Sequence, residues 1–119
     1  MAEVQSARAW EKAQELALEV QRLSQTLPAQ EKHGLTEQLR RAGADSASNL
    51  AECQVPGTDY ARAAGKAGAA AGEVLYYLML ARDRGYLTEP ESASGRDLAT
   101  EVLRLANSLR QHHDSTTTA

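Results

Sequence analysis

Large aromatic side chains are nearly missing from this sequence, which has no phenylalanine, one tryptophan and four tyrosines among 119 residues. A hydrophobic core therefore has to come from leucine, valine and alanine, and alanine has the highest helix propensity. The single cysteine, Cys53, excludes an intrachain disulfide. Long apolar runs are missing as well, because the most apolar stretch, residues 67–81, contains Glu73 and is too short to span a bilayer. These absences favour an all-helical protein outside the membrane.

The sequence also lacks a strong excess of charge of either sign. Its 13 basic and 16 acidic residues give a formal net charge of −3 and are spread evenly along the chain. The overall electrostatic field therefore gives no support for nucleic-acid binding, which leaves only a local basic patch as a candidate. The first residues contain no apolar signal core, so we expect a cytoplasmic protein.

Apolar residues recur at helical spacing in four segments that proline and glycine separate. In the last segment Leu98, Val102, Leu105 and Leu109 lie on one helical face, because three or four positions separate each from the next. We predict helices at about residues 6–26, 28–54, 59–84 and 90–112, one domain over residues 1–113, and a disordered polar tail at 114–119. Four helices of this length with short connections predict an all-α, antiparallel up-down-up-down bundle.

The third predicted helix carries an unbroken seam of apolar residues that is small in its first half and bulky in its second. Gly68 and Gly72 lie in the small half, and each glycine inside a helix costs about 1 kcal/mol relative to alanine. We therefore predict that another helix approaches closely here, with the small polar half of the second helix around Ser46 and Asn49 opposite. Asn49 is expected to form a hydrogen bond across that contact, since buried polar groups need partners.

Several ordered blocks resemble the four-helix bundle proteins encoded in intervening sequences of bacterial 23S rRNA genes. The blocks are Trp10-Glu11-Lys12-Ala13, Leu27-Pro28, Gln38-Leu39-Arg40-Arg41-Ala42, Ser48-Asn49-Leu50-Ala51-Glu52, Leu80-Ala81-Arg82-Asp83 and Gly85-Tyr86-Leu87. The fourth block is similar to the Ser-Asn-Ile-Ala-Glu-Gly of the family, although Cys53 replaces the final glycine. The resemblance implies an up-down bundle that assembles as a ring, commonly a homopentamer, in a family with no established biochemical activity.

A retroelement protein adds a second implication. The accessory protein of diversity-generating retroelements is similar in fold to this family and is thought to engage reverse transcriptase and nucleic acid. The first functional prediction is therefore a non-enzymatic, self-assembling scaffold or accessory protein whose partner is itself. The alternative is a nucleic-acid-binding accessory protein that acts through a basic ring surface.

Arg40 and Arg41 are the candidate residues for that alternative. Adjacent residues on a helix are about 100° apart, so both can lie on one broad face. They could contact phosphate or bridge to a neighbouring subunit. They could equally form ordinary pairs along the helix, for example with Glu37, each contributing about 0.2–0.5 kcal/mol.

The remaining candidate residues are structural or belong to interfaces. Trp10, Tyr76 and Tyr77 are expected to anchor the core or a subunit contact, and because adjacent tyrosines point in different directions, at most one of the pair fits the core. Cys53 is interpreted as a small packed residue.

Two carboxylates, Glu52 and Glu73, need a separate interpretation. We expect them to pair with Arg40, Arg41 or Arg82, within or between subunits. A catalytic carboxylate pair is the competing interpretation, but no nucleophile accompanies it, so no enzyme is predicted.

Metal and cofactor sites have little support in the sequence. Di-iron bundles use Glu-x-x-His motifs, and this chain has none. His33 and Glu37 are four residues apart, which alone is a weak metal signal, and His112-His113 sits near a helix end where only adventitious binding is expected. We predict no metal and no cofactor, and a metal or small-molecule binding bundle is the remote alternative.

Overall fold

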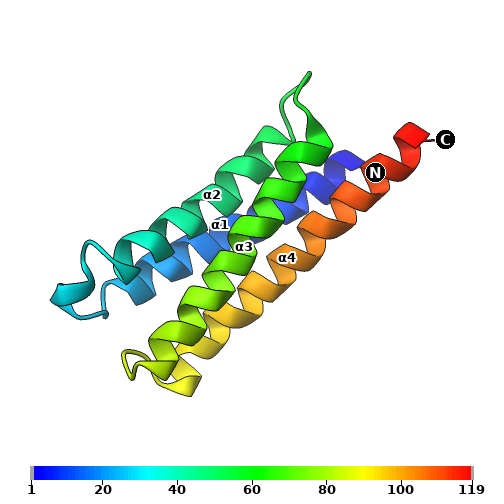
Figure 1. The fold of residues 1–119 in the computed structure, drawn as a ribbon. Helices are drawn as coiled ribbons and strands as arrows, with labels where there is room; N and C mark the ends of the chain where they lie inside the picture. The colour runs from blue at the N-terminus through cyan, green and yellow to red at the C-terminus, as the bar shows by residue number, and fades with distance from the viewer. Residues whose placement is uncertain (1, 119) are drawn as a thin grey trace.

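The computed structural model describes residues 2–118, and it describes the side chains of residues 4–111. Within that part of the chain the elements are α1 (Ala2–Ser24), the short 3-10 helix η1 (Ala29–Glu31), α2 (Leu35–Glu52), α3 (Tyr60–Asp83) and α4 (Glu89–Thr118). The long helices run alternately up and down in a bundle of 49 × 23 × 19 Å (Figure 1). The predicted all-α, antiparallel four-helix bundle is confirmed.

Each long helix packs mainly against two neighbours. α1 and α3 both contact α2 and α4, so α1 and α3 occupy opposite corners of the bundle. The core consists of leucine, valine and alanine, as the composition predicts. Its largest fully buried side chains include Leu16, Leu23, Leu39, Leu50, Leu78, Val20, Val74 and Val102.

The start of α2 differs from the prediction, which placed it at residue 28. Pro28 is extended, with φ −65° and ψ 149°, and introduces η1 instead, and α2 begins only at Leu35. The Glu31 carboxylate accepts hydrogen bonds from the Leu35 amide at 3.3 Å and from the Tyr86 hydroxyl at 2.8 Å. It also pairs with Arg84 at 3.1 Å, so one side chain joins the α1–α2 and α3–α4 connections. Apolar spacing carries no information about such a long-range contact.

The other helix ends follow ordinary capping chemistry. The Asp59 carboxylate caps α3 by accepting from the Arg62 amide at 3.2 Å. Gly85 ends α3 with a φ of 78°, which favours glycine. Helix α4 extends to Thr118. The predicted disordered tail at 114–119 lies outside the residues whose side chains the structure describes, so it stays a prediction.

The predicted contact of Gly68 and Gly72 with the small polar half of α2 is wrong. A Cβ atom at Gly68 would lie 3.1 Å from Asn107 Oδ1 and 3.6 Å from Ala106 Cβ, and both of these residues belong to α4. A Cβ atom at Gly72 would meet nothing within 4 Å. Asn49 does not bond across a helix contact either, because its amide donates to the Asp45 carbonyl of its own helix at 2.8 Å.

Two other glycines also lie at close helix approaches, and Gly95 is the tighter of the two. A Cβ atom at Gly95 of α4 would lie 2.8 Å from Leu78 Cδ1 and 3.2 Å from Leu23 Cδ1. A Cβ atom at Gly43 of α2 would lie 3.2 Å from Val20 Cγ1 on α1. Because glycine has no side chain at these two positions, α4 and α2 can pack closely against a core whose side chains are mostly aliphatic. Over the part of the chain that is described, no helix has both the length and the apolar character that crossing a bilayer requires.

Candidate interaction surfaces

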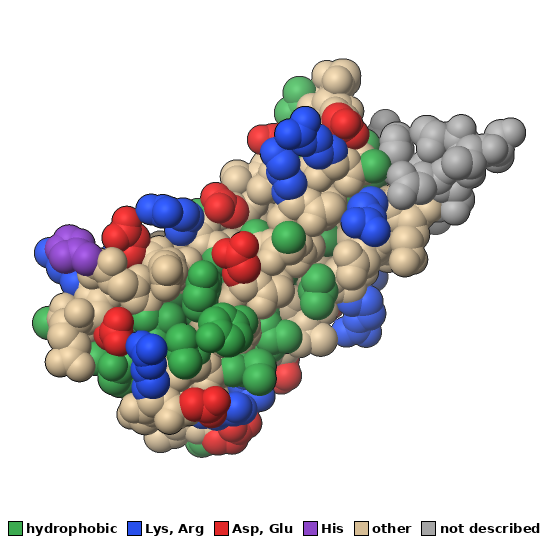
Figure 2. Space-filling model, in the orientation of Figure 1, with side chains coloured by type: hydrophobic (Ala, Val, Ile, Leu, Met, Phe, Trp, Pro, Cys, Tyr) green, Lys and Arg blue, Asp and Glu red, His purple; other side chains and the backbone are tan. Residues whose placement is uncertain are grey.

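The side of α3 that faces away from the core is the first candidate surface. It carries the exposed residues Arg62, Lys66, Ala69, Glu73, Tyr76 and Met79, which we call the α3 outer stripe. Tyr76 is 58% exposed and Met79 is 39% exposed, although both are large and apolar. In the space-filling view, hydrophobic side chains gather over this part of the bundle (Figure 2). Exposed aromatic and methionine side chains such as Tyr76 and Met79 are enriched at protein contacts.

The two adjacent tyrosines occupy different environments, as their position on a helix predicts. Tyr77 is half-buried and packs against the core, whereas Tyr76 extends into solvent. Their rings meet edge to face, with centroids 5.6 Å apart and an interplanar angle of 61°. The core therefore fixes Tyr77, and Tyr77 in turn supports the exposed ring of Tyr76.

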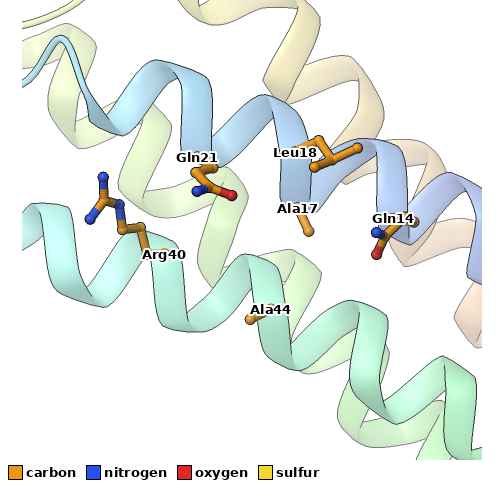
Figure 3. A pocket seen from close by; sticks show the side chains of 6 residues that line it. All are labelled: Gln14, Ala17, Leu18, Gln21, Arg40 and Ala44. Carbon is orange, nitrogen blue, oxygen red and sulfur yellow. The ribbon is translucent and has the colours of Figure 1, made fainter.

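A groove between α1 and α2 is the second candidate surface. Gln14, Ala17, Leu18 and Gln21 of α1 line it together with Arg40 and Ala44 of α2, and its volume is about 340 Å³. Ala17 and Ala44 lie in its middle, while Gln21 and Arg40 lie toward one end and Gln14 toward the other (Figure 3). We call this set the α1–α2 groove. Its small alanines leave the hollow, and Leu18 beside them is 59% exposed.

Arg40 is held at the end of this groove by a contact between the two helices. Its Nε atom donates to the Ser24 hydroxyl at 2.8 Å, and Ser24 is only 2% exposed. Within residues 4–111 no carboxylate lies within ion-pair distance of Arg40. The guanidinium group is therefore tethered to α1, and none of the described carboxylates neutralises its charge.

A shallow basic depression lies next to the groove and shares Arg40 with it. Lys32, His33, Thr36, Glu37, Arg40 and Arg41 line this depression, which has a volume of about 520 Å³. Arg41 pairs with Glu37 at 3.0 Å along the helix, as the spacing predicts. Both arginines are exposed on the same broad face, so a local concentration of positive charge exists despite the net negative charge of the chain.

Neither of the predicted carboxylates pairs with an arginine inside the chain. Glu52 and Glu73 are both exposed, and among the described side chains neither reaches Arg40, Arg41 or Arg82. Arg82 instead pairs with Asp83 at 3.2 Å and with Glu89 at 3.1 Å. The within-chain form of that prediction is wrong, and pairing between subunits stays a prediction.

Cys53 and Trp10 are packed side chains. Burial raises the pKa of the Cys53 thiol to about 11, with a smaller contribution from the nearby Glu52 carboxylate. The thiol donates a long hydrogen bond of 3.8 Å to the Tyr60 carbonyl and stays protonated at neutral pH. Trp10 is half-buried and packs against the core from α1.

Among the described residues, the candidate metal ligands do not lie beside enough further ligating side chains to form a metal site. The described residues contain no group of three or more His, Cys, Asp or Glu side chains that could hold a metal ion. His33 and Glu37 share the basic depression with Lys32 and Arg41, whose positive charges would repel a cation. His112 and His113 lie outside the residues whose side chains are described.

Comparisons with known proteins agree with this fold. A family model described as "23S rRNA-intervening sequence protein" matches residues 5–108. The crystal structure of a protein of unknown function from the S23 ribosomal protein family of Bacteroides thetaiotaomicron is similar, with a TM-score of 0.81 and 22% sequence identity. That similarity covers 90% of this chain and 98% of the other. No curated protein matches the chain. Neither description names a catalytic activity.

Proposed function

We propose that this chain, which belongs to the 23S rRNA-intervening sequence protein family, is a non-enzymatic scaffold or accessory protein that assembles with copies of itself. The resemblance to the family implies a ring, commonly of five copies, and the N-terminal sequence favours a cytoplasmic location. The partner in this proposal is therefore a second copy of the chain. The assembled particle presents the same surface once for each copy.

The observation that carries this proposal is the exposure of Tyr76 at 58% next to Met79. The core is already closed without these side chains, so their exposure adds nothing to the stability of a lone chain. Tyrosine and methionine are enriched in protein interfaces because they bury a large area with few or adaptable rotatable bonds. Leu18 is similarly exposed on another helix, so apolar side chains face solvent on two sides of the bundle.

The chemistry of the single thiol supports a non-enzymatic role. A nucleophilic cysteine needs a lowered pKa, whereas burial raises the pKa of Cys53 to about 11. The carboxylates with lowered pKa values, such as Glu19 beside Arg22 and Glu31 beside Tyr86, accept structural hydrogen bonds. These groups are arranged to hold helices and connections together.

Mass measurement tests the proposal directly. Light scattering coupled to gel filtration, and native mass spectrometry, should give a particle of several chains, with five as the expected number. The assembly should persist on dilution into the low micromolar range, where stable interfaces survive. A monomer under these conditions would contradict the proposal.

Nucleic-acid binding is the second candidate function, and the basic depression favours it. Lys32, His33, Arg40 and Arg41 gather around it, and Glu37 is the one carboxylate among the described residues that line it. Phosphate contacts of this kind make affinity fall as salt rises. We expect RNA or DNA binding at low salt that an Arg41→Glu variant weakens strongly.

Arg104→Glu is the matched control for this experiment. Arg104 is exposed on α4, away from the depression, and makes no ion pair within the described residues. This variant changes the net charge in the same direction and should retain most of the binding. Equal loss in both variants would indicate a nonspecific effect of charge, and no binding at low salt would rule out the second function.

A further inference from the structure

We propose that the α1–α2 groove binds a small amphipathic carboxylate, with the charged head on Arg40 and the apolar tail over Ala17 and Ala44. The chemical class of the ligand is a carboxylic acid that carries a slender apolar chain. The residues that line the groove all belong to one chain, so the site is complete without a second copy. The inference therefore goes beyond the proposed self-assembly and does not rest on it.

Arg40 selects the head group of the ligand. It is the one charged side chain among the described residues that line the groove. Its Nε atom donates to the buried Ser24 hydroxyl at 2.8 Å, which leaves the two terminal nitrogens of the guanidinium group for a ligand. No described carboxylate pairs with it. A planar guanidinium group matches the two oxygens of a carboxylate, and such charge-assisted hydrogen bonds are stronger than neutral ones.

The middle of the groove selects the tail of the ligand. Ala17 and Ala44 are the smallest side chains that line it, and the apolar side chain of Leu18 beside them is 59% exposed. Arg40 lies toward one end of the groove and Gln14 toward the other, with the two alanines between them (Figure 3). An apolar chain laid along this line would remove the alanines and Leu18 from water, and the gain is proportional to the apolar area covered.

The length of the groove limits the length of the tail. Gln14 and Gln21 are seven residues apart, which is about 10.5 Å along the helix and close to the length of an extended chain of about eight carbons. The groove volume of about 340 Å³ lies at the lower end of the range for small-molecule sites. Gln21 lies toward the Arg40 end, where its amide can donate a further hydrogen bond to the head group. A ligand of the size of octanoate fits these dimensions.

The charge of the groove favours a carboxylate over a phosphate. One guanidinium group neutralises a single negative charge, whereas a phosphate monoester carries about −1.5 to −2 at neutral pH. The neighbouring basic depression also contains Lys32 and Arg41, so it suits a phosphate better. The head group is therefore the property of the ligand that distinguishes the groove from the depression.

A titration of the full chain with octanoate, followed by the amide signals in nuclear magnetic resonance, tests the site. Octanoate should shift the amide signals of the groove, those of Ala17, Leu18 and Ala44 above all. Acetate and octan-1-ol should each bind at least about tenfold more weakly, because acetate lacks the tail and octan-1-ol lacks the charge. From butanoate to octanoate, each added methylene should tighten binding about twofold, since an open groove covers only part of each one.

Two variants and a matched control separate the head from the tail. Arg40→Gln should weaken octanoate binding about tenfold and leave octan-1-ol binding unchanged, because only the carboxylate uses the guanidinium group. Ala44→Leu should weaken the binding of both ligands, because it fills the middle of the groove from an exposed helical position. Arg8→Gln is the control. Arg8 is exposed on α1 and does not line the groove, so this variant should bind like the wild type.

The outcomes that would overturn the inference differ from those that bear on self-assembly. An absence of shifts in the groove would overturn it, including the case in which a second copy covers the groove. Equal binding of octanoate and octan-1-ol would show that the groove does not recognise a carboxylate. Octyl phosphate that binds more tightly than octanoate would assign the head group to the basic depression instead. A monomeric wild type that binds octanoate would contradict the proposed self-assembly and leave this inference intact.

Discussion

Two positions one turn apart on α3 carry the same small residue in different surroundings. Gly68 lies against Asn107 and Ala106 of α4, where a neighbouring helix occupies the space that a side chain would take. A Cβ atom at Gly72 would meet nothing within 4 Å, and the large side chain of Tyr76 lies exposed one turn further on. The first glycine is a packing position, whereas the second leaves open space beside an exposed tyrosine. A glycine-rich stretch alone therefore does not identify a packing site.

The test with the largest expected effect concerns Gly95, the most tightly packed glycine. We expect Gly95→Leu to lower the free energy of unfolding by about 3 kcal/mol, since even a Cβ atom there would lie 2.8 Å from Leu78 Cδ1. Overpacked cores shift backbone and rotamers rather than expand smoothly. Urea unfolding followed by circular dichroism measures the effect. An unchanged midpoint would show that the contact between α4 and the core is looser than described.

A second test compares the neighbouring tyrosines. Tyr77→Ser should lower the free energy of unfolding by about 2 kcal/mol, because the ring packs against the core. Tyr76→Ser, with its ring 58% exposed, should change the stability of the folded monomer by less than about 0.5 kcal/mol. The comparison should be made at a concentration low enough to avoid assembly. Similar losses at both positions would remove the distinction between the two sides of α3.

A third test asks whether Gly72, which has open space beside it, only lowers the stability of the helix. Gly72→Ala should raise the free energy of unfolding by about 1 kcal/mol, because alanine favours the helix and nothing obstructs its Cβ atom. Gly68→Ala should gain less, since its Cβ atom would lie 3.1 Å from Asn107 Oδ1. If Gly72→Ala proves destabilising in dilute solution, the space beside Gly72 is occupied in the folded chain.

The smallest expected effect concerns pH and extends the comparison from helix sides to the connections. The Tyr86 hydroxyl, followed by the Leu35 amide, lowers the pKa of the Glu31 carboxyl. A lowered folded pKa means that the stabilisation is complete above the unfolded pKa and is lost as the pH falls through the folded value. The difference in melting temperature between wild type and Glu31→Gln should therefore be present at neutral pH and shrink in acid. A difference that is independent of pH would contradict this assignment. Tyr86→Phe is the control, because it removes the hydroxyl that donates to Glu31.

The bundle itself follows from the sequence because the spacing of apolar residues defines which side of each helix is buried. Leu98, Val102, Leu105 and Leu109 illustrate this, since all four lie toward the core or partly so. Spacing does not state which neighbouring helix a flank will meet. For that reason the sequence pattern predicts Gly68 against α2, although its flank faces α4. Which neighbouring helix the flank meets depends on the handedness of the bundle, and the spacing of apolar residues does not specify that handedness.

The candidate surfaces were only partly predictable. Tyr76, Arg40 and Glu73 could be singled out because large or charged residues stand out on a predicted helix. The α1–α2 groove could not, because Ala17 and Ala44 look like ordinary core alanines in the sequence and become a hollow only when two helices lie side by side. The role of Glu31 was missed for a related reason, since its hydroxyl partner lies 55 residues away in the chain.

The only tryptophan is half-buried and can serve as an intrinsic fluorescence probe. Trp10 lies on α1, and because no second indole contributes to the signal, its emission reports the surroundings of one known position without any label. A shift in its emission colour on dilution would register a change in hydration around α1, and the same signal would follow denaturation.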